Sequence, residues 1–290
     1  NCSYQSEAFF RLWSKKRGDG GLIEGGLVFT EDLEAYAKLS HQQIIASLGN
    51  NREADGKNLG GPAVVALVHA SQILVDQNVE VTFHGVVGAD ENADLVRSTI
   101  ESTPLRAELK TVPTMSTPTT EVFDDPSMRG GKGERSFINT IGAAYAFDAT
   151  DLPPSFYDSD ILLLGGTALV PNLHDQQHQV LKMAKERGCV TVVGTVYDFR
   201  NEKASSTGRW PLGSLPAYPF IDVLVCDEQE ALRLTGTSLV EDAAKQLIAF
   251  GVGAFIITRG ALPMLLWSSG KLIESTPLST LPVSAYMDEL

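Results

Sequence analysis

Short apolar runs alternate with longer amphipathic stretches along the second half of the chain, and this alternation constrains the fold more than any other feature of the sequence. Residues 172–187 carry apolar side chains at helical spacing and are followed by Gly188, a common helix terminator. Such a strand–helix alternation predicts a parallel sheet with helices on both faces, which binds ligands beyond the carboxyl ends of its strands. The runs with the length and two-sided apolar character of buried strands are 161–164, 189–196, 221–226 and 254–258.

The first half of the chain is less regular. It opens with a strand pattern at 25–30 and a helix pattern over 31–48. Further on, β-like segments fill 115–144 around a glycine-rich stretch at 130–133 that is typical of a turn. These segments predict a hairpin that projects from the main sheet. Because the sequence has neither an internal repeat nor a long linker, we expect one α/β domain over residues 1–290.

Capping patterns mark several expected helix starts. Pro62, after two glycines, opens an apolar helix pattern that continues to residue 74. Asp90 follows a strand pattern at 79–87 and is suited to cap the next helix. Ser238 and, three residues later, Glu241 have the spacing of a capping box.

The charge balance argues against two classes of partner. The chain has 23 basic and 36 acidic side chains, a net charge of −13, so phosphate backbones and anionic lipid surfaces would repel it. No uncharged apolar run approaches the roughly 20 residues of a membrane span. The first 20 residues also lack the apolar core of a signal peptide. We therefore expect a cytoplasmic protein that binds neither nucleic acid nor membrane.

Cysteines and histidines offer little sign of a metal site or a disulfide framework. Cys2, Cys189 and Cys226 are odd in number and lack CxxC spacing, and two of them lie in apolar runs, so we expect buried structural thiols. His174 and His178 have the i, i+4 spacing of a metal pair. No acidic residue completes a HExxH pattern, and we expect ordinary surface histidines.

Glycine and acidic motifs follow one another in a definite order on the expected elements. They are Gly60-Gly61, Gly85-Val86-Val87-Gly88-Ala89-Asp90, Gly133-Glu134-Arg135-Ser136-Phe137, Asp198 at a strand end, Asp227-Glu228-Gln229-Glu230 before Leu234-Thr235-Gly236, and Thr258-Arg259-Gly260. In this order and spacing, over roughly residues 20–285, the sequence resembles the ribokinase-like or PfkB-type kinases, which include ribokinase, fructokinase and adenosine kinase.

The resemblance implies a fold and a reaction. The fold is a three-layer α/β/α arrangement with a mostly parallel central sheet and a small β-sheet lid, formed by about 13–30 and 115–140. The reaction is ATP-dependent phosphoryl transfer to a hydroxyl of a sugar or nucleoside, with Mg²⁺ as cofactor. Such a reaction depends on positioning and charge neutralisation, supplied by backbone amides, a metal site and a base.

The resemblance also implies which residues bind the nucleotide. Asp227 and Glu230 stand at the family's Asn-x-x-Glu position, which organises magnesium and the triphosphate, with Asp in place of Asn. Thr258 and Gly260 would contact the nucleotide, and Asp198 would face the same crevice. The plain alternatives are an acidic first helical turn for the Asp227–Glu230 pair and a strand-ending turn for Thr258 to Gly260. Arg200, near Asp198, would pair either with that carboxylate or with a ligand anion.

On the substrate side, the resemblance implies that Gly60 and Gly61 form the hinge of the lid and approach a polyol closely. The alternative is a glycine pair that simply precedes a helix. Arg135, with Lys132, would form a basic patch near the substrate, or else carry solvated charges on the hairpin. As a projecting sheet edge, the hairpin is also a docking surface, so a homodimer through the lid is a further expectation.

The sequence departs from the family in three places. The motif Asp-Thr-x-Gly-Ala-Gly-Asp, which supplies an anion hole and the aspartate base, does not occur. The family's first strand is missing as well, and Val65 replaces an Asn in the helix after the glycine pair. We expect a trimmed piece of a longer active kinase. The alternative is a catalytically inactive homologue that binds a sugar or nucleotide as a sensor; a nicotinamide-dependent dehydrogenase is disfavoured because no GxGxxG opens a helix.

Overall fold

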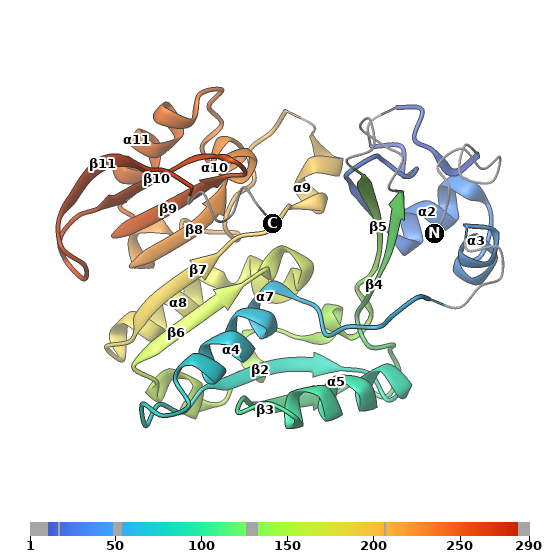
Figure 1. Cartoon of the computed structure of the whole chain (residues 1–290), viewed down its shortest axis with the longest axis horizontal. Helices are drawn as coiled ribbons and strands as arrows, with labels where there is room; N and C mark the ends of the chain where they lie inside the picture. Colours follow the sequence, from blue (N-terminus) through green and yellow to red (C-terminus); the bar gives the residue numbers. More distant parts are fainter. Residues whose placement is uncertain (1–10, 17, 49–53, 126–132, 206, 284–290) are drawn as a thin grey trace. The chain divides into compact units, whose positions relative to one another are not determined.

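A computed structural model describes residues 11–16, 18–48, 54–125, 133–205 and 207–283, and the chain divides into two compact units (Figure 1). Unit 1 comprises residues 1–60, 86–99 and 111–144. Unit 2 comprises residues 61–85, 100–110 and 145–290.

The sheet of unit 1 has three strands in the order β1-β5-β4. Strand β1 (Leu27–Phe29) pairs in parallel with β5 (Glu134–Thr140), and β4 (Thr119–Asp125) pairs with β5 in antiparallel register, Val122 opposite Phe137. The antiparallel pair confirms the predicted hairpin. Its glycine-rich turn lies outside the described residues, apart from Gly133.

Two helices, α2 (Thr30–Ala37) and α3 (His41–Leu48), follow β1. The prediction of one helix over 31–48 is wrong because Lys38 adopts a left-handed conformation (φ 55°) that ends α2. Both helices pack their apolar faces on the small sheet. The buried core that they share with it consists of Leu12, Leu22, Val28, Leu33, Ile44, Leu48 and Ile138.

Unit 2 is built on a six-stranded sheet in the order β11-β10-β9-β8-β7-β6. The four strands β6 to β9 are parallel, whereas β10 and β11 form antiparallel pairs at one edge. The parallel strands coincide with the four apolar runs of the sequence. The bounds are β6 Ile161–Gly165, β7 Val190–Gly194, β8 Val223–Asp227, β9 Ala254–Arg259, β10 Leu262–Ser268 and β11 Thr276–Leu281.

Helices between the strands cover this sheet. The predicted helix at 172–187 is two helices that meet at Gln176, whose backbone closes α7. The predicted capping box at Ser238 is wrong because the backbone enters α11 at Leu239, without a side-chain cap. The α-helices of unit 2 are α4 Pro62–Ile73, α7 Pro171–Asp175, α8 Gln177–Glu186, α9 Phe199–Ala204, α10 Glu228–Thr235 and α11 Val240–Phe250. Short 3₁₀ helices lie at Ala149–Asp151, Pro154–Asp158, Thr167–Leu169 and Tyr218–Phe220. A further 3₁₀ helix, Gly142–Ala146, has residues in both units.

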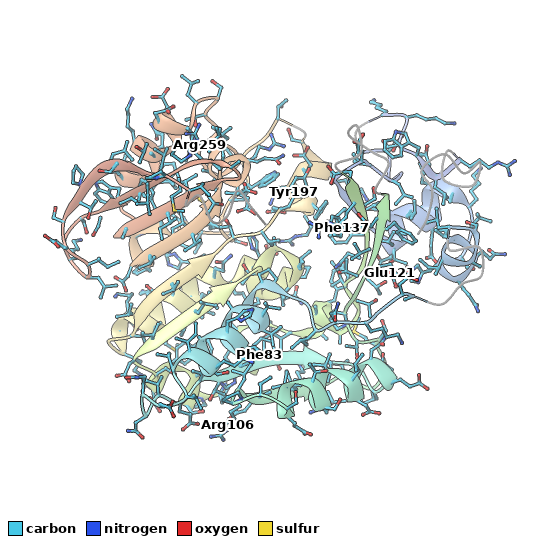
Figure 2. All side chains as sticks on the ribbon, viewed as in Figure 1. Phe83, Arg106, Glu121, Phe137, Tyr197 and Arg259 are labelled. Atoms are coloured by element: carbon cyan, nitrogen blue, oxygen red, sulfur yellow. The ribbon has the colours of Figure 1, made fainter. Side chains whose placement is uncertain are left out.

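A strand–helix–strand segment runs through both units. Strand β2 (Thr82–Val87) leads into α5 (Glu91–Glu101), and β3 (Arg106–Thr111) returns beside β2. Figure 2 labels Phe83 on β2 and Arg106 on β3. As predicted, Asp90 caps α5: its Oδ1 accepts a hydrogen bond from the backbone N–H of Ala93 at 2.9 Å.

These elements confirm the predicted fold class, a mixed α/β protein with a mostly parallel sheet and a separate small sheet. Cys189 and Cys226 are buried free thiols, as expected of structural cysteines. None of the helices in the described segments is both long and apolar enough to cross a bilayer.

Candidate functional site

A pocket in unit 2 lies where three parallel strands end. Thr167 follows β6, Thr195 directly follows β7, and Glu230 follows β8 in the first turn of α10, and all three line the pocket. Asp198 and Trp210, from the segment after β7, also line it. The sequence predicted ligand-binding residues at this edge of the sheet, and the structure brings two of them, Asp198 and Glu230, to one pocket.

Asp227 and Glu230 form a reciprocal capping box at the start of α10. The Oδ1 of Asp227 accepts a hydrogen bond from the N–H of Glu230 at 2.7 Å, and Glu230 Oε2 accepts one from the N–H of Asp227 at 2.9 Å. The two residues thus form the acidic first helical turn that stood as the plain alternative for this pair. One oxygen of each carboxylate, Asp227 Oδ2 and Glu230 Oε1, receives no hydrogen bond from the described residues.

Glu230 is mostly removed from solvent, with 9% of its surface exposed. Burial raises the pKa of its carboxyl group, and hydrogen bonds from the Thr195 hydroxyl and the Asp227 backbone partly offset this effect. The Thr195 hydroxyl donates to Glu230 Oε2 at 2.6 Å.

Asp227 and Thr258 are partners in the register of β8 and β9, so both lie at the carboxyl edge of the sheet. The Thr258 hydroxyl is 3.5 Å from the Cys226 carbonyl oxygen. Gly260 lies in the turn after β9, where a Cβ added to it would have no atom of the described residues within 4 Å. Between them, Arg259, labelled in Figure 2, donates from Nε to Glu228 at 3.1 Å. Asp227, Thr258 and Gly260 thus share one edge of the sheet, although none of them lines the pocket.

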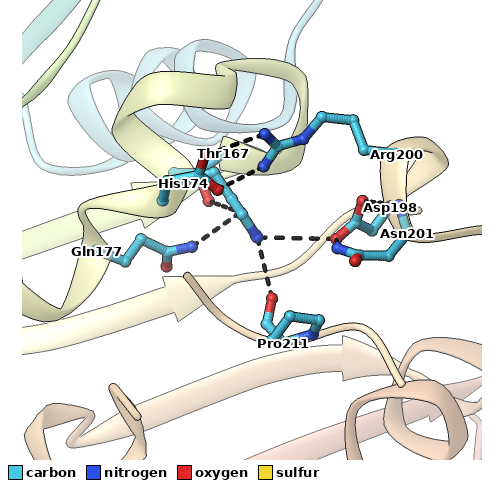
Figure 3. A network of polar contacts seen from close by, with 8 residues as sticks. Thr167, His174, Gln177, Asp198, Arg200, Asn201 and Pro211 are labelled. Atoms are coloured by element: carbon cyan, nitrogen blue, oxygen red, sulfur yellow. Dashed lines mark hydrogen bonds and ion pairs between the residues drawn. The ribbon is translucent and has the colours of Figure 1, made fainter. Parts of the chain in front are cut away.

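Asp198 is 2% exposed and caps the short helix α9. Its carboxylate accepts hydrogen bonds from the backbone N–H of Asn201 at 3.1 Å and from the Asn201 amide at 2.6 Å. Arg200 does not pair with Asp198, contrary to one of the two expectations. Its guanidinium forms a two-pronged ion pair with Asp175, at 2.7 and 3.1 Å, which lowers the pKa of that carboxyl group (Figure 3).

His174 is buried, with 3% of its surface exposed, so the prediction of a surface histidine is wrong for this residue. Its Nε2 lies 3.0 Å from the carbonyl oxygen of Pro211, which can only accept, so this nitrogen carries the proton (Figure 3). Nδ1 then accepts from the Gln177 amide at 3.0 Å and lies 3.1 Å from the Thr167 hydroxyl. Burial lowers the pKa of the imidazole, which stays neutral in this network.

The predicted substrate residues lie elsewhere. The chain passes from unit 1 to unit 2 between Gly60 and Gly61, and Gly61 has a φ of 103°, which favours glycine. Arg135 is an exposed residue of β5 in unit 1, and its guanidinium lies 5.6 Å from the ring centre of Phe137, which Figure 2 labels. Its predicted partner Lys132 lies outside the described residues.

Comparison with known protein families shows to which family the chain belongs. The family described as pfkB family carbohydrate kinase matches residues 35–285. The chain belongs to this family. A comparison with curated protein sequences gives no match.

Solved structures support the fold of this pfkB family chain. Adenosine kinase from Anopheles gambiae, solved with P1,P4-di(adenosine-5) tetraphosphate, is 20% identical, with a TM-score of 0.66 over 92% of this chain and 75% of that one. Adenosine kinase from Schistosoma mansoni, solved with 2-fluoroadenosine, is 15% identical, with a TM-score of 0.68 over 92% and 76%. Ribokinase from Thermotoga maritima is 20% identical, with a TM-score of 0.57 over 81% and 70%. All three share the ribokinase-like fold with this chain.

The carboxylate oxygens of Asp227 and Glu230 in this pfkB family chain are of the kind that binds Mg²⁺. Within the described ranges, no three His, Cys, Asp or Glu side chains gather to hold a metal ion. Mg²⁺ in phosphoryl-transfer sites is usually held by one or two carboxylates together with substrate phosphates and water. The oxygens of Asp227 and Glu230 that the capping box does not use match this donor set.

Sequence reasoning missed Thr195 as a residue of this site. It is the first polar side chain after β7, but the predicted strand ran to residue 196, so the signal that drew attention to Asp198 did not mark it. No local signal marks His174, because its burial depends on Pro211, 37 residues away. Trp210 packs in the wall of the pocket: it is 2% exposed, and its ring makes an edge contact with the ring of Tyr197 at a centre-to-centre distance of 4.7 Å.

Proposed function

We propose that this chain carries the nucleotide-binding part of an ATP-dependent kinase that phosphorylates a hydroxyl of a sugar or nucleoside. The observation that supports the proposal most directly is the pocket at the ends of the parallel strands, where Thr195, Asp198 and Glu230 meet. Membership of the pfkB family supplies the reaction class.

In this proposal, the triphosphate lies along the carboxyl edge of β8 and β9. Thr258 and Gly260 bind the nucleotide, where an open turn lets backbone amides approach it. Asp227 and Glu230 each offer one oxygen toward Mg²⁺ or its water, and Asp198 lines the neighbouring pocket. When bound, Mg²⁺ neutralises phosphate charge and orients the triphosphate.

The reaction transfers one phosphoryl group. The substrate hydroxyl oxygen forms a bond to the γ-phosphorus, the bond from this phosphorus to the β,γ-bridging oxygen breaks, and ADP leaves, while the hydroxyl proton passes to a base. We assign to this chain the binding and orientation of the nucleotide. The capping box holds the two carboxylates in fixed positions, so little reorganisation is required when ATP binds.

On the substrate side, Gly60 and Gly61 act as the hinge between the two units, and Arg135 faces the substrate. The chain crosses between the units at this glycine pair, which supports the hinge. Several solved structures of similar fold are adenosine kinases, so nucleosides are the first substrates to test and sugars the second.

The experiment has two readouts. Binding of ADP, with and without Mg²⁺, is measured by titration calorimetry, and ADP formation is followed with ATP and a panel of nucleosides and sugars. Mg²⁺-dependent binding together with turnover of one substrate supports the kinase. Absence of nucleotide binding overturns the proposal.

The alternative is a ligand sensor without catalysis. The feature that favours it is the acidic residue Asp227, which stands where the family has Asn and adds a negative charge beside the phosphates. A sensor would show saturable stabilisation by a sugar or nucleotide and no phosphate transfer with any member of the panel.

A further inference from the structure

The hydroxyl of Thr195 links the end of one strand to the start of the neighbouring helix. Thr195 follows β7, where its backbone N–H donates to the Val225 carbonyl oxygen of β8 at 3.0 Å. Its side chain donates to Glu230 Oε2 at 2.6 Å. The pairing of β7 with β8 therefore fixes the backbone of Thr195, and the Thr195 hydroxyl in turn holds the Glu230 carboxylate on α10.

This hydrogen bond gives the two oxygens of Glu230 different surroundings. Oε2 accepts from both Thr195 and the N–H of Asp227, whereas Oε1 accepts from none of the residues that the structure describes. Without Thr195, only the backbone bond at 2.9 Å would orient the carboxylate. A charged side chain with one remaining hydrogen bond could rotate and expose either oxygen to the pocket that both residues line.

We propose that Thr195 is a positioning residue: its hydroxyl locks Oε2 of Glu230 and keeps Oε1 available to Mg²⁺ or to a water molecule bound to it. This inference rests on the proposed function, because it assigns Glu230 to the metal and phosphate site. Thr195 acts on the metal site through Glu230, because its hydroxyl donates to Oε2 of that carboxylate.

The alternative is that the hydrogen bond serves only the packing of β7 against α10. Two substitutions separate these roles. T195V keeps the shape of the side chain and removes the hydroxyl, whereas T195S keeps the hydroxyl and removes a methyl group. A packing role predicts that both variants lose stability and that neither changes the effect of Mg²⁺ on nucleotide binding.

The test measures ADP affinity by calorimetry in the presence of Mg²⁺ and again in EDTA. We expect the gain in affinity that Mg²⁺ gives the wild-type protein to fall about tenfold in T195V, the range of one hydrogen bond to a charged group. In T195S we expect the gain to stay within about twofold of wild type. Affinity in EDTA is the reference for each variant, so the ratio of the two affinities reports the Mg²⁺ gain alone.

The substitution E230Q, alone and combined with T195V, completes the experiment. If Thr195 acts through Glu230, T195V has no further effect on the Mg²⁺ gain in the E230Q background. Additive losses, or a wild-type Mg²⁺ gain in folded T195V, would overturn the inference. If wild-type protein binds ADP without any gain from Mg²⁺, or does not bind it, the proposed function fails first, and the two failures are distinguished by the wild-type titration alone.

Discussion

The Nε2 of His174 lies 3.7 Å from Oδ2 of Asp198, and both side chains are almost fully buried. The imidazole is nevertheless neutral, because burial lowers its pKa more strongly than the nearby carboxylate raises it. In the unfolded chain, the same histidine takes up a proton near its ordinary pKa of about 6.5.

This difference predicts how stability depends on pH. Below about pH 6.5 the unfolded state binds a proton that folded His174 does not, so this residue makes the folded state less stable as the pH falls. In H174Q that contribution disappears. We expect the free energy of unfolding, measured in urea at pH 7.5 and pH 5.5, to fall less in H174Q than in wild type. Q179A, an exposed change on the next helix, α8, should keep the wild-type pH dependence. An equal fall in unfolding free energy between the two pH values in all three proteins would contradict the prediction.

Truncation of the same residue tests the network at neutral pH. H174A removes the partner of the Gln177 amide and of the Pro211 carbonyl oxygen. Each buried polar group left without a partner costs about 1–3 kcal/mol, so for these two groups we expect a loss of roughly 2–6 kcal/mol of unfolding free energy. Urea unfolding at pH 7.5 measures the loss. A change below 1 kcal/mol would mean that water replaces the imidazole at little cost.

The charge of Asp227 can be tested apart from its role as a cap. Asn also caps helices well, so D227N should keep the stability of the protein, whereas D227A should lose about 1 kcal/mol. Removal of one negative charge near phosphates is worth about 1 kcal/mol, so in EDTA, where no metal ion uses the carboxylate, we expect D227N to bind ATP about fivefold more tightly at low salt. Calorimetry in EDTA gives the affinities and thermal unfolding gives the stabilities. Weaker ATP binding in D227N would show that the carboxylate itself is needed.

The two glycines before α4 predict different outcomes although they are adjacent. Gly61 has a φ of 103°, so G61A forces an unfavourable backbone conformation and should destabilise the protein by about 1–2 kcal/mol. Gly60 has open space around it and no such strain, so G60A should be neutral in stability within about 0.5 kcal/mol. Thermal unfolding distinguishes them. Equal losses in both variants would contradict the backbone argument.

The order of elements was predictable from sequence because buried parallel strands are apolar on both faces. The four runs at 161–164, 189–196, 221–226 and 254–258 all became neighbouring strands, and Asp90 caps a helix as its position indicated. Local patterns were sufficient for these elements, although the capping box that the local spacing of Ser238 and Glu241 predicted does not form.

The sequence was less informative where distant residues decide the outcome. His174 has a polar side chain on a helix, which by itself indicates exposure, yet Pro211 and Asp198 enclose it. The helix over 31–48 breaks because Lys38 turns left-handed, which its residue type does not favour. The link between Thr195 and Glu230 spans 35 residues and depends on the pairing of β7 with β8, which only the assembled sheet provides.

Close packing of α4 on β6 gives a last prediction. Gly165 ends β6, and a methyl group on its Cα would lie 3.0 Å from the Cβ and 3.1 Å from the Cα of Ala63. These atoms belong to a helix that cannot shift as freely as a flexible side chain, so G165A should destabilise the protein by about 1–3 kcal/mol.

Gly194 ends β7 opposite Gly165 in the strand register and provides a matched control, because the nearest atom to its added methyl group is 4.0 Å away. G194A should therefore leave the unfolding free energy within about 0.5 kcal/mol of wild type. A loss in G194A as large as in G165A would mean that the strand ends, rather than the helix contact, require glycine.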